Sequence, residues 1–249
     1  MSAPAIPNGA TVLEVAGVQK SYGALRPLRI RSLTILSGQR MALSGIDAGA
    51  SEVLVNLVTG AGLPDEGVVR VFGRATADIA DGDAWLASLD CFGIVSPRAV
   101  ILDGVTVQQN LAMPFGLHID PVPPDIAVKV AALATECGLD AIPRPGQPDD
   151  GWLGCRAGDA PPEVRARVHL GRAIALGAAL LVLEHPTADL PPAARSAYAA
   201  DLVRIAEGRR LATLVITADA DFGVRVAHQA FELQPATGAL KPVRKGWFW

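Results

Sequence analysis

The stretch Arg40–Gly60, which reads RMALSGIDAGASEVLVNLVTG, decides the fold. Its first residues, Arg40–Ser44, are a short apolar run typical of a buried strand. A glycine-containing turn follows at Gly45–Ala50, and an amphipathic helix is expected over Glu52–Val58. Gly60 follows directly after this helix and suits the left-handed backbone that ends many helices. The stretch therefore predicts a strand, a turn and a helix in direct succession.

Further along the chain, two more apolar runs have the character of internal strands. Ala178–Leu183 and Leu211–Thr217 show no polar alternation, which implies burial on both faces of a parallel sheet. Helical stretches are expected after each of them, at Ala193–Ala206 and Asp221–Ala227. Strands that alternate with helices in this way predict an α/β core with a mainly parallel sheet.

The remaining segments predict how the chain is organised. Residues 1–10 are rich in Pro, Gly and Ala and are expected to be a disordered leader, which leaves 11–249 as a single domain. Val12–Ala16 and Leu28–Leu36 are expected to be strands. The middle, about 85–172, is expected to be mainly helical with proline-rich breaks, and is interpreted as an inserted helical lobe.

Composition narrows the class of protein. Half of the 249 residues are hydrophobic, yet no run approaches the 18 or so apolar residues that a membrane span needs. The three cysteines have no metal-ligand spacing, and their sparse, odd number suits a reducing cytosol. The net charge of −3 and the mixing of acids and bases argue against a nucleic-acid partner. The expectation is a cytosolic α/β protein without direct membrane insertion.

The order and spacing of several segments resemble the ABC-transporter ATPase family over residues 12–235, nearest to the lipoprotein-release and lipid-transport ATPases. The resemblance implies a P-loop NTPase-like core, an antiparallel β portion near the N-terminus, the helical lobe, and ATP with Mg²⁺ as ligands. The segments that carry it are Val18–Gly23, Leu43–Gly60, GVTVQQNLAMP (104–114), GRAIALGAALLVLEHPTADL (171–190) and LVITADAD (214–221).

The nucleotide-binding loop of such a protein points backbone N–H groups at phosphate and adds a Lys and a Mg²⁺-binding Ser or Thr. Here Ser51 stands where the family has Lys, and Glu52 where it has Ser or Thr. Ala48 and Ala50 replace glycines. Weak nucleotide binding and a plain strand-to-helix connection are equal alternatives for this loop. The candidate nucleotide-binding residues are Tyr22, Gly45, Asp47, Gly49, Ser51 and Glu52.

Tyr22 matches the aromatic residue that stacks on adenine in the family. A buried aromatic that closes a strand turn explains the same residue equally well. Both interpretations stay open at the level of sequence.

The signature motif of the family grips a phosphate bound by the opposite subunit through a Ser hydroxyl and free amides. In the matching stretch, Ala160–Val164, Pro161 and Pro162 have no amide donor, and Glu163 adds a negative charge. We therefore expect only a helix start here, capped by Asp159. Pro97 likewise stands at the position of the Gln that couples the magnesium site to the membrane subunit.

The strand that ends in the catalytic Asp–Glu pair of the family matches Leu180–His185. Glu184 could hold Mg²⁺, as could Glu52, whereas His185 replaces the residue that orients the attacking water. Ala218 stands at the position of the switch His. Pro191 stands where relatives have an Asp that reaches across the dimer.

All the hydrolytic groups are thus absent together, although their strands and helices remain. We interpret the chain as a degenerate, hydrolysis-incompetent subunit that partners a membrane permease and a second ABC ATPase at the inner face of the membrane. The alternatives are an ATPase with unorthodox residues, using Glu184 and His185, and a stand-alone interaction protein that reuses the fold. The resemblance implies partner contacts at Val105, Gln108, Pro161, Pro162 and Pro191.

Overall fold

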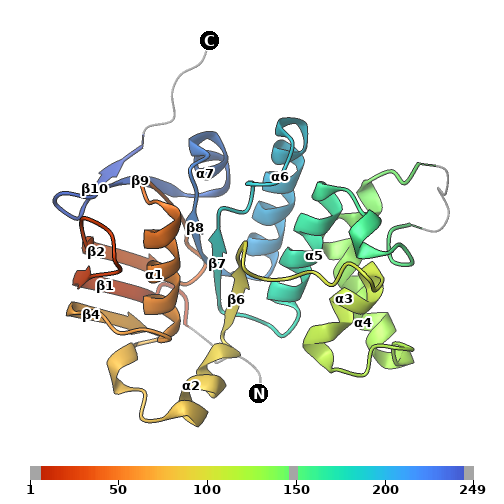
Figure 1. Ribbon diagram of the computed structural model, residues 1–249, viewed down its shortest axis with the longest axis horizontal. Helices are drawn as coiled ribbons and strands as arrows, with labels where there is room; N and C mark the ends of the chain where they lie inside the picture. Colours follow the sequence, from red (N-terminus) through yellow and green to blue (C-terminus); the bar gives the residue numbers. More distant parts are fainter. Residues whose placement is uncertain (1–6, 146–150, 244–249) are drawn as a thin grey trace.

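The computed structural model describes residues 7–145 and 151–243 as two sheets with helices packed around them (Figure 1). Residues 1–6 of the expected leader and the aromatic end Gly246–Trp249 lie outside the described residues. Within the described part, Pro7–Ala10 forms a turn, closed by a hydrogen bond from the Ala10 amide to the Pro7 carbonyl (3.2 Å).

The first sheet is antiparallel and lies near the N-terminus, as expected. Its strand order is β2-β1-β4-β5. Strand β1 pairs antiparallel with both β2 and β4. The bounds are β1 Thr11–Lys20, β2 Leu28–Leu36, β4 Glu66–Val71 and β5 Arg74–Ala75.

The second sheet is mainly parallel and has the strand order β10-β9-β3-β8-β7-β6. Strands β9, β3, β8, β7 and β6 run parallel, and β10 pairs antiparallel with β9 at one edge. The bounds are β3 Arg40–Ser44, β6 Phe92–Val95, β7 Leu180–Glu184, β8 Ala212–Ile216, β9 Gln229–Gln234 and β10 Ala239–Pro242.

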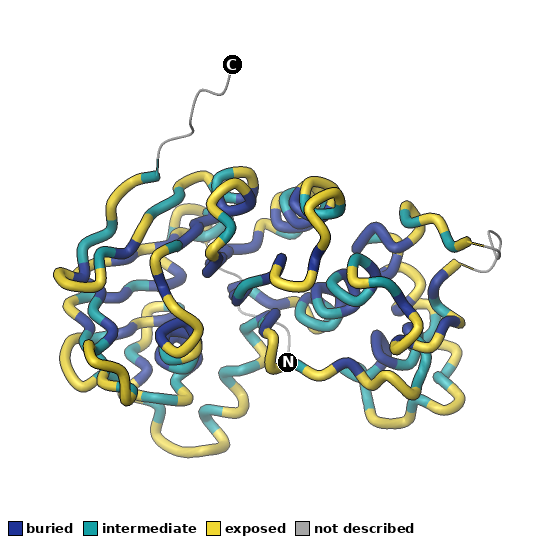
Figure 2. Tube along the Cα trace, turned by 45° about the horizontal axis from the view of Figure 1, so that its top comes forward, coloured by how far each residue is buried: buried dark blue, intermediate teal, exposed yellow. Residues whose placement is uncertain are grey.

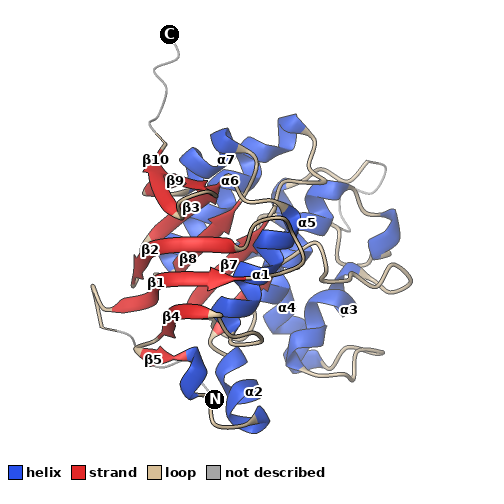
Figure 3. Ribbon diagram, turned by 60° about the vertical axis from the view of Figure 1, so that its left-hand side comes forward, coloured by secondary structure: helices blue, strands red, loops and turns tan. Residues whose placement is uncertain are grey.

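Helix α1, Ala48–Thr59, lies between the two sheets (Figure 3). Its buried residues Leu54, Val55, Leu57 and Val58 pack in one hydrophobic cluster with residues of β1, β2, β3, β7 and β8. The opposite face of the parallel sheet is covered by α5 (Pro162–Ile174), α6 (Pro192–Gly208) and α7 (Ala220–Val226). Buried segments follow the central strands, and exposed ones gather at the connecting loops (Figure 2).

Strand β7 confirms the prediction that an unbroken apolar run is buried on both faces. Leu180 and Val182 belong to the cluster around α1, whereas Leu181 and Leu183 belong to the cluster around α5 and α6. Successive side chains of a strand point to opposite faces, so one run of leucine and valine serves both cores.

In the described part of region 85–172, helices alternate with loops, and there is also one strand that the sequence interpretation did not separate. β6 lies inside these bounds and is an edge strand of the parallel sheet, paired with β7. Four residues are too few to show a period, and the pairing partner is distant in sequence. The helices here are α2 (Gly82–Leu89), α3 (Val107–Ala112), α4 (Pro124–Glu136) and α5.

Two helix starts differ from expectation. α1 begins at Ala48, earlier than the expected Glu52, because the Asp47 carboxylate accepts a hydrogen bond from the Ala50 amide (2.7 Å) and caps the helix. α5 has Pro161 as its N-cap residue with no side-chain cap, so Asp159 does not play the expected role. Two successive prolines remove amide donors that a cap would otherwise have to satisfy.

Candidate functional site

The carboxyl ends of β3, β7 and β6 meet at one edge of the parallel sheet, and the candidate residues gather there. Parallel strands bring their carboxyl ends to the same edge, where ligands of open α/β sheets bind. Ser51 in the first turn of α1 and Glu184 at the end of β7 lie 2.7 Å apart, measured between the hydroxyl and a carboxylate oxygen. Two candidates separated by 133 residues are thus brought together.

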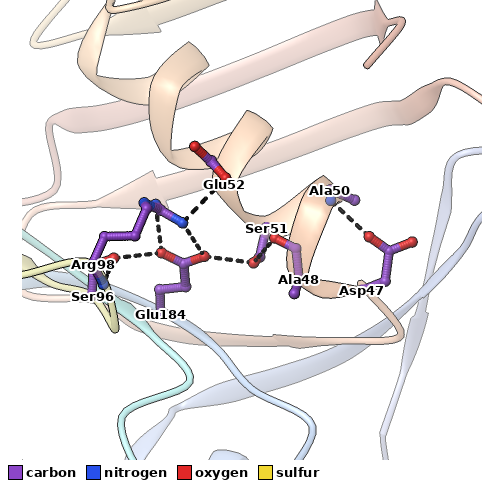
Figure 4. A network of polar contacts seen from close by, with 8 residues as sticks. All are labelled: Asp47, Ala48, Ala50, Ser51, Glu52, Ser96, Arg98 and Glu184. Atoms are coloured by element: carbon purple, nitrogen blue, oxygen red, sulfur yellow. Dashed lines mark hydrogen bonds and ion pairs between the residues drawn. The ribbon is translucent and has the colours of Figure 1, made fainter. Parts of the chain in front are cut away.

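Glu184 is buried, with 2% of its surface exposed, and its carboxylate is surrounded by donors (Figure 4). Arg98 binds it with two guanidinium nitrogens, at 3.0 and 2.7 Å. The Ser96 hydroxyl donates to it at 2.9 Å. The Ser51 hydroxyl lies 2.7 Å from Glu184 and 2.8 Å from the Ala48 carbonyl, and its single proton serves one of them at a time. Both carboxylate oxygens are therefore engaged by groups of this chain.

The charge of Glu184 is retained despite its burial. Desolvation by burial raises the pKa of this carboxyl, but the hydrogen bonds from Ser51, Arg98 and Ser96 and the charge of Arg98 outweigh it. The net effect lowers the pKa below its ordinary value. Glu184 is thus an ionised carboxylate paired to an internal cation.

Arg98 also links the two acidic candidates for magnesium. Its guanidinium lies 3.6 Å from Glu52 as well as 2.7 Å from Glu184, between the two carboxylates. In the part of the chain that the structure describes, no group of three or more His, Cys, Asp or Glu side chains has metal-binding geometry. A guanidinium at this point repels a divalent cation, so the observed arrangement does not fit Mg²⁺ held jointly by Glu52 and Glu184.

The turn before α1 is filled by the chain's own groups. One oxygen of the Asp47 carboxylate accepts from the Ala50 amide, and the other lies 3.3 Å from the Tyr22 hydroxyl. The Ser51 amide donates to the Asp47 carbonyl (2.8 Å). The anion-binding end of α1 is thus capped by a carboxylate that is part of the loop itself. This arrangement does not fit a phosphate group.

The two glycines of this turn have structural reasons to be there. Gly45 has φ +76°, and a Cβ atom on it would lie 2.7 Å from the Leu233 carbonyl oxygen. A Cβ atom on Gly49 would lie 3.2 Å from the Tyr22 ring. Close packing of the chain accounts for both glycines without a nucleotide.

Tyr22 lies over Gly49 and is half-buried rather than enclosed. Burial, followed by the charge of Asp47 and the hydrogen bond to it, raises the pKa of the Tyr22 hydroxyl. The ring therefore packs on the loop that the sequence proposed as a nucleotide site, and adenine contact stays a prediction.

His185 and Ala218 lie together on a neighbouring cavity, together with Asp219 and Arg195. His185 has φ +46°, in the left-handed region that residues other than glycine rarely adopt, and its amide donates to the Ile216 carbonyl (2.8 Å). Arg195 and Asp219 form an ion pair at 2.9 Å. The candidates His185 and Ala218 therefore line the same cavity, whereas Ser51 and Glu52 do not line it.

The candidate partner contacts lie on separate segments. Val105 and Gln108 lie beside Thr106, which caps α3 in a capping box with Gln109. The chain's own segment near 153–157 bonds to this region, for example from the Gln108 amide to the Leu153 carbonyl (3.0 Å). Pro161 and Pro162 begin α5, and Pro191 is the N-cap residue of α6.

Arg98 is the functional residue that sequence reasoning missed. It lies one residue after Pro97, in the loop that follows β6. Its only sequence signal is an isolated basic residue just after a short apolar run. That signal gains meaning once β6 is known to lie beside β7, which carries Glu184.

Comparisons with known proteins bear out the resemblance. No family model matches the chain. It is 28% identical over 219 residues to a sulfate/thiosulfate import ATP-binding protein of Thermosynechococcus vestitus, covering 87% of this chain and 60% of that protein. It is 26% identical to a lipoprotein-releasing system ATP-binding protein of Alcanivorax borkumensis, covering 89% of this chain and 94% of that protein. The chain thus spans less than two thirds of the length of some of the relatives it matches.

Solved structures show the same architecture. An ATP-binding cassette bound to ADP and phosphate matches with a TM-score of 0.73 at 16% identity, covering 94% of this chain and all of that one. A cassette from Clostridium perfringens, part of an ABC transporter complex, matches with a TM-score of 0.75 at 16% identity, covering 96% and 89%. The fold is that of an ABC nucleotide-binding cassette. The curated homologues are ABC transporter ATP-binding proteins, so the chain is related to this family in sequence as well as in fold.

Proposed function

We propose that this chain is a non-hydrolysing cassette subunit that serves as a structural or regulatory partner in an ABC transporter. The observation that carries the proposal is the closed pairing of Glu184 with Arg98, Ser96 and Ser51. It occupies the place where a hydrolysing cassette needs a lysine, a metal ion and a positioned water.

Phosphoryl transfer depends almost entirely on positioning and on stabilising charge, and the groups involved act as a unit. In this chain Ser51 cannot supply the charge of a lysine, and Asp47 already caps the amide that a phosphate would use. Each lost charge-assisted hydrogen bond costs about 1.5–3 kcal/mol. The combined loss supports a subunit that keeps the shape of a cassette without its hydrolytic step.

The proposed partners are a membrane permease and a second cassette, with the chain at the inner face of the membrane. Support comes from the relatives, which are named as ATP-binding proteins of import and release systems. No helix among the described residues is long and apolar enough to cross a membrane. In this proposal a separate membrane subunit supplies the transport path.

The alternative is a hydrolysing cassette in which Glu184 holds magnesium and His185 orients water. The observation in its favour is that His185 faces a cavity at the strand ends, beside Ala218 and Asp219. It requires Arg98 to leave Glu184 when nucleotide arrives.

Two measurements on the purified chain separate the proposals. The first is calorimetric titration with ATP and Mg²⁺, with Tyr22→Ala as the variant that removes the aromatic contact. The second is phosphate release by the wild type, His185→Ala and Glu184→Gln. We expect phosphate release equal to that of a protein-free blank in all three samples. Turnover that is abolished by His185→Ala or Glu184→Gln would overturn the proposal in favour of the alternative.

A further inference from the structure

A cavity of about 500 Å³ lies beside Glu184, on the side of the strand ends away from α1. Its walls are the loop 95–103, the first turns of α5 and the loop 184–190. Tyr198 of α6 completes the wall. The volume falls within the roughly 300–1,000 Å³ typical of small-molecule sites.

Much of this wall is apolar, which suits the body of an organic molecule. Val95, Ile101 and Leu190 are buried residues of the wall, and Ala166 adds a small side chain from α5. An apolar wall with few polar groups is the usual composition of a ligand pocket.

Two of the charged residues on the wall are already satisfied. Glu184 is held by Arg98 and the serines, and Arg165 pairs with Asp103 at 2.7 Å. The wall therefore offers no unpaired cation among the described residues, which disfavours phosphate or carboxylate ligands. With the pairs Glu184–Arg98 and Arg165–Asp103 set aside, Asp189 is the one carboxylate of the wall without a partner among the described residues.

Four polar side-chain groups of the wall have no hydrogen-bond or ion-pair partner within the ranges 7–145 and 151–243. They are the Asp189 carboxylate, the His169 and His185 imidazoles and the Tyr198 hydroxyl, the last of which is fully buried. A buried polar group without a partner is costly, so an unpaired hydroxyl on a cavity wall calls for an explanation.

His169 is uncharged at neutral pH. Its pKa is lowered to about 4, first by burial and then by the charges of Arg172 and Arg165, while Asp189 acts in the opposite direction. A neutral imidazole offers one donor and one acceptor to a ligand. His169 and Asp189 both line the cavity.

We propose that this cavity binds a small organic amine, with the ammonium group against Asp189 and the apolar body along the wall within reach of His169. The site goes beyond the proposed cassette function, because it needs neither nucleotide nor the pairing of Glu184. Such a ligand supplies a cation to the one unpaired carboxylate and leaves the existing ion pairs intact.

Three probes with the same ring test the charge preference: tyramine, 4-ethylphenol and 4-hydroxyphenylacetate, each titrated by calorimetry into the purified chain. We expect tyramine to bind with a dissociation constant at least about tenfold lower than that of the acid, with the neutral phenol between them. Equal or tighter binding of the acid would overturn the proposal. Absence of tyramine binding at about 10 mM, the weak end of useful affinities, would do so too.

Two variants locate the site. Asp189→Asn should weaken tyramine binding by about tenfold and leave 4-ethylphenol unchanged, because only the amine uses the charge. Asp83→Asn, at an exposed position on α2, is the matched control and should change neither. Tyramine binding that is indifferent to Asp189→Asn would contradict the assignment.

Filling the cavity provides an independent check. Ala166→Leu should abolish binding of all three probes, while Ala197→Leu, at an exposed position of α6, should not. If Ala166→Leu fails to fold, Asp189→Asn decides alone, since Asp189 is exposed and carries no packing. These readouts are binding measurements, so they stand or fall separately from the test for ATP turnover.

Discussion

The body of strand β7 and its carboxyl end are adjacent in sequence and obey different rules. In the body, Leu180–Leu183 are fully buried and divide their side chains between two hydrophobic clusters. At the end, Glu184 is equally buried but is held by polar groups from other segments, and His185 adopts a left-handed backbone. The body requires only apolar residues, whereas the end requires particular partners.

This difference explains how a cassette can keep its fold while its site changes. The hydrophobic effect that buries apolar strands is non-directional, so a buried strand position accepts any apolar residue of suitable size. A buried carboxylate needs a counter-charge, and Arg98 from the loop after β6 provides it. The charged groups at the site edge are thus paired within the chain, beside strands that remain buried through apolar residues.

The largest expected effect lies in the strand body. Leu181→Ala should lower the free energy of unfolding by about 3 kcal/mol, because it leaves a cavity between β7 and the helices that cover it. Urea unfolding measures the change. Leu176→Ala, at a residue that is 52% exposed, is the control and should cost far less. Equal losses of unfolding free energy in the two variants would contradict the expected difference between the strand body and the surface.

A smaller loss is expected at the strand end. Arg98→Ala leaves Glu184 buried without its counter-ion and should lower the free energy of unfolding by about 2 kcal/mol. This loss is smaller than that expected for a fully buried pair, because the guanidinium of Arg98 is half-exposed. The double variant with Glu184→Gln should cost less than the sum of the single ones. Additive costs in urea unfolding would show that the pair is not coupled, and Arg26→Ala at an exposed position serves as control.

The cap of α1 is expected to contribute less again. Asp47→Ala should destabilise the chain by about 1 kcal/mol, because the Ala50 amide loses its acceptor. Asp47→Asn keeps an acceptor oxygen and should retain most of the stability. If the alanine variant is as stable as the wild type, Asp47 does not hold the turn closed.

The smallest effect is a pH dependence from His169. Its pKa is about 4 in the folded chain and about 6.5 when unfolded, so the unfolded state takes up the proton first as the pH falls. Stability should therefore decline between pH 6.5 and pH 4, by at most about 1 kcal/mol after allowance for solvent screening of the half-exposed ring. His169→Gln should flatten this decline. His118→Gln, at an exposed position, should leave it unchanged.

The sequence predicted the strands well and the paired site poorly. β2 and β3 have the expected bounds, and β7 and β8 fall within a residue or two of theirs. β6, β9, β10 and the early start of α1 were not predicted. The four-residue strand β6 shows no period, and the cap of α1 depends on which way Asp47 turns. The sequence shows a serine at position 51, where the resemblance implies a lysine, but it gave no sign that Arg98 is the cation that holds Glu184.

By itself, the sequence determined the α/β class and the place of the main buried strands along the chain, since both follow from local pattern. Only the tertiary structure decided that β6 lies beside β7 and that Arg98 therefore reaches Glu184. The spacing of apolar residues can be read from neighbouring positions in the sequence. An ion pair between residues 86 positions apart depends instead on how the strands are ordered in the sheet. The pairing of Arg98 with Glu184 at the carboxyl ends of the strands therefore follows from the strand order of the sheet.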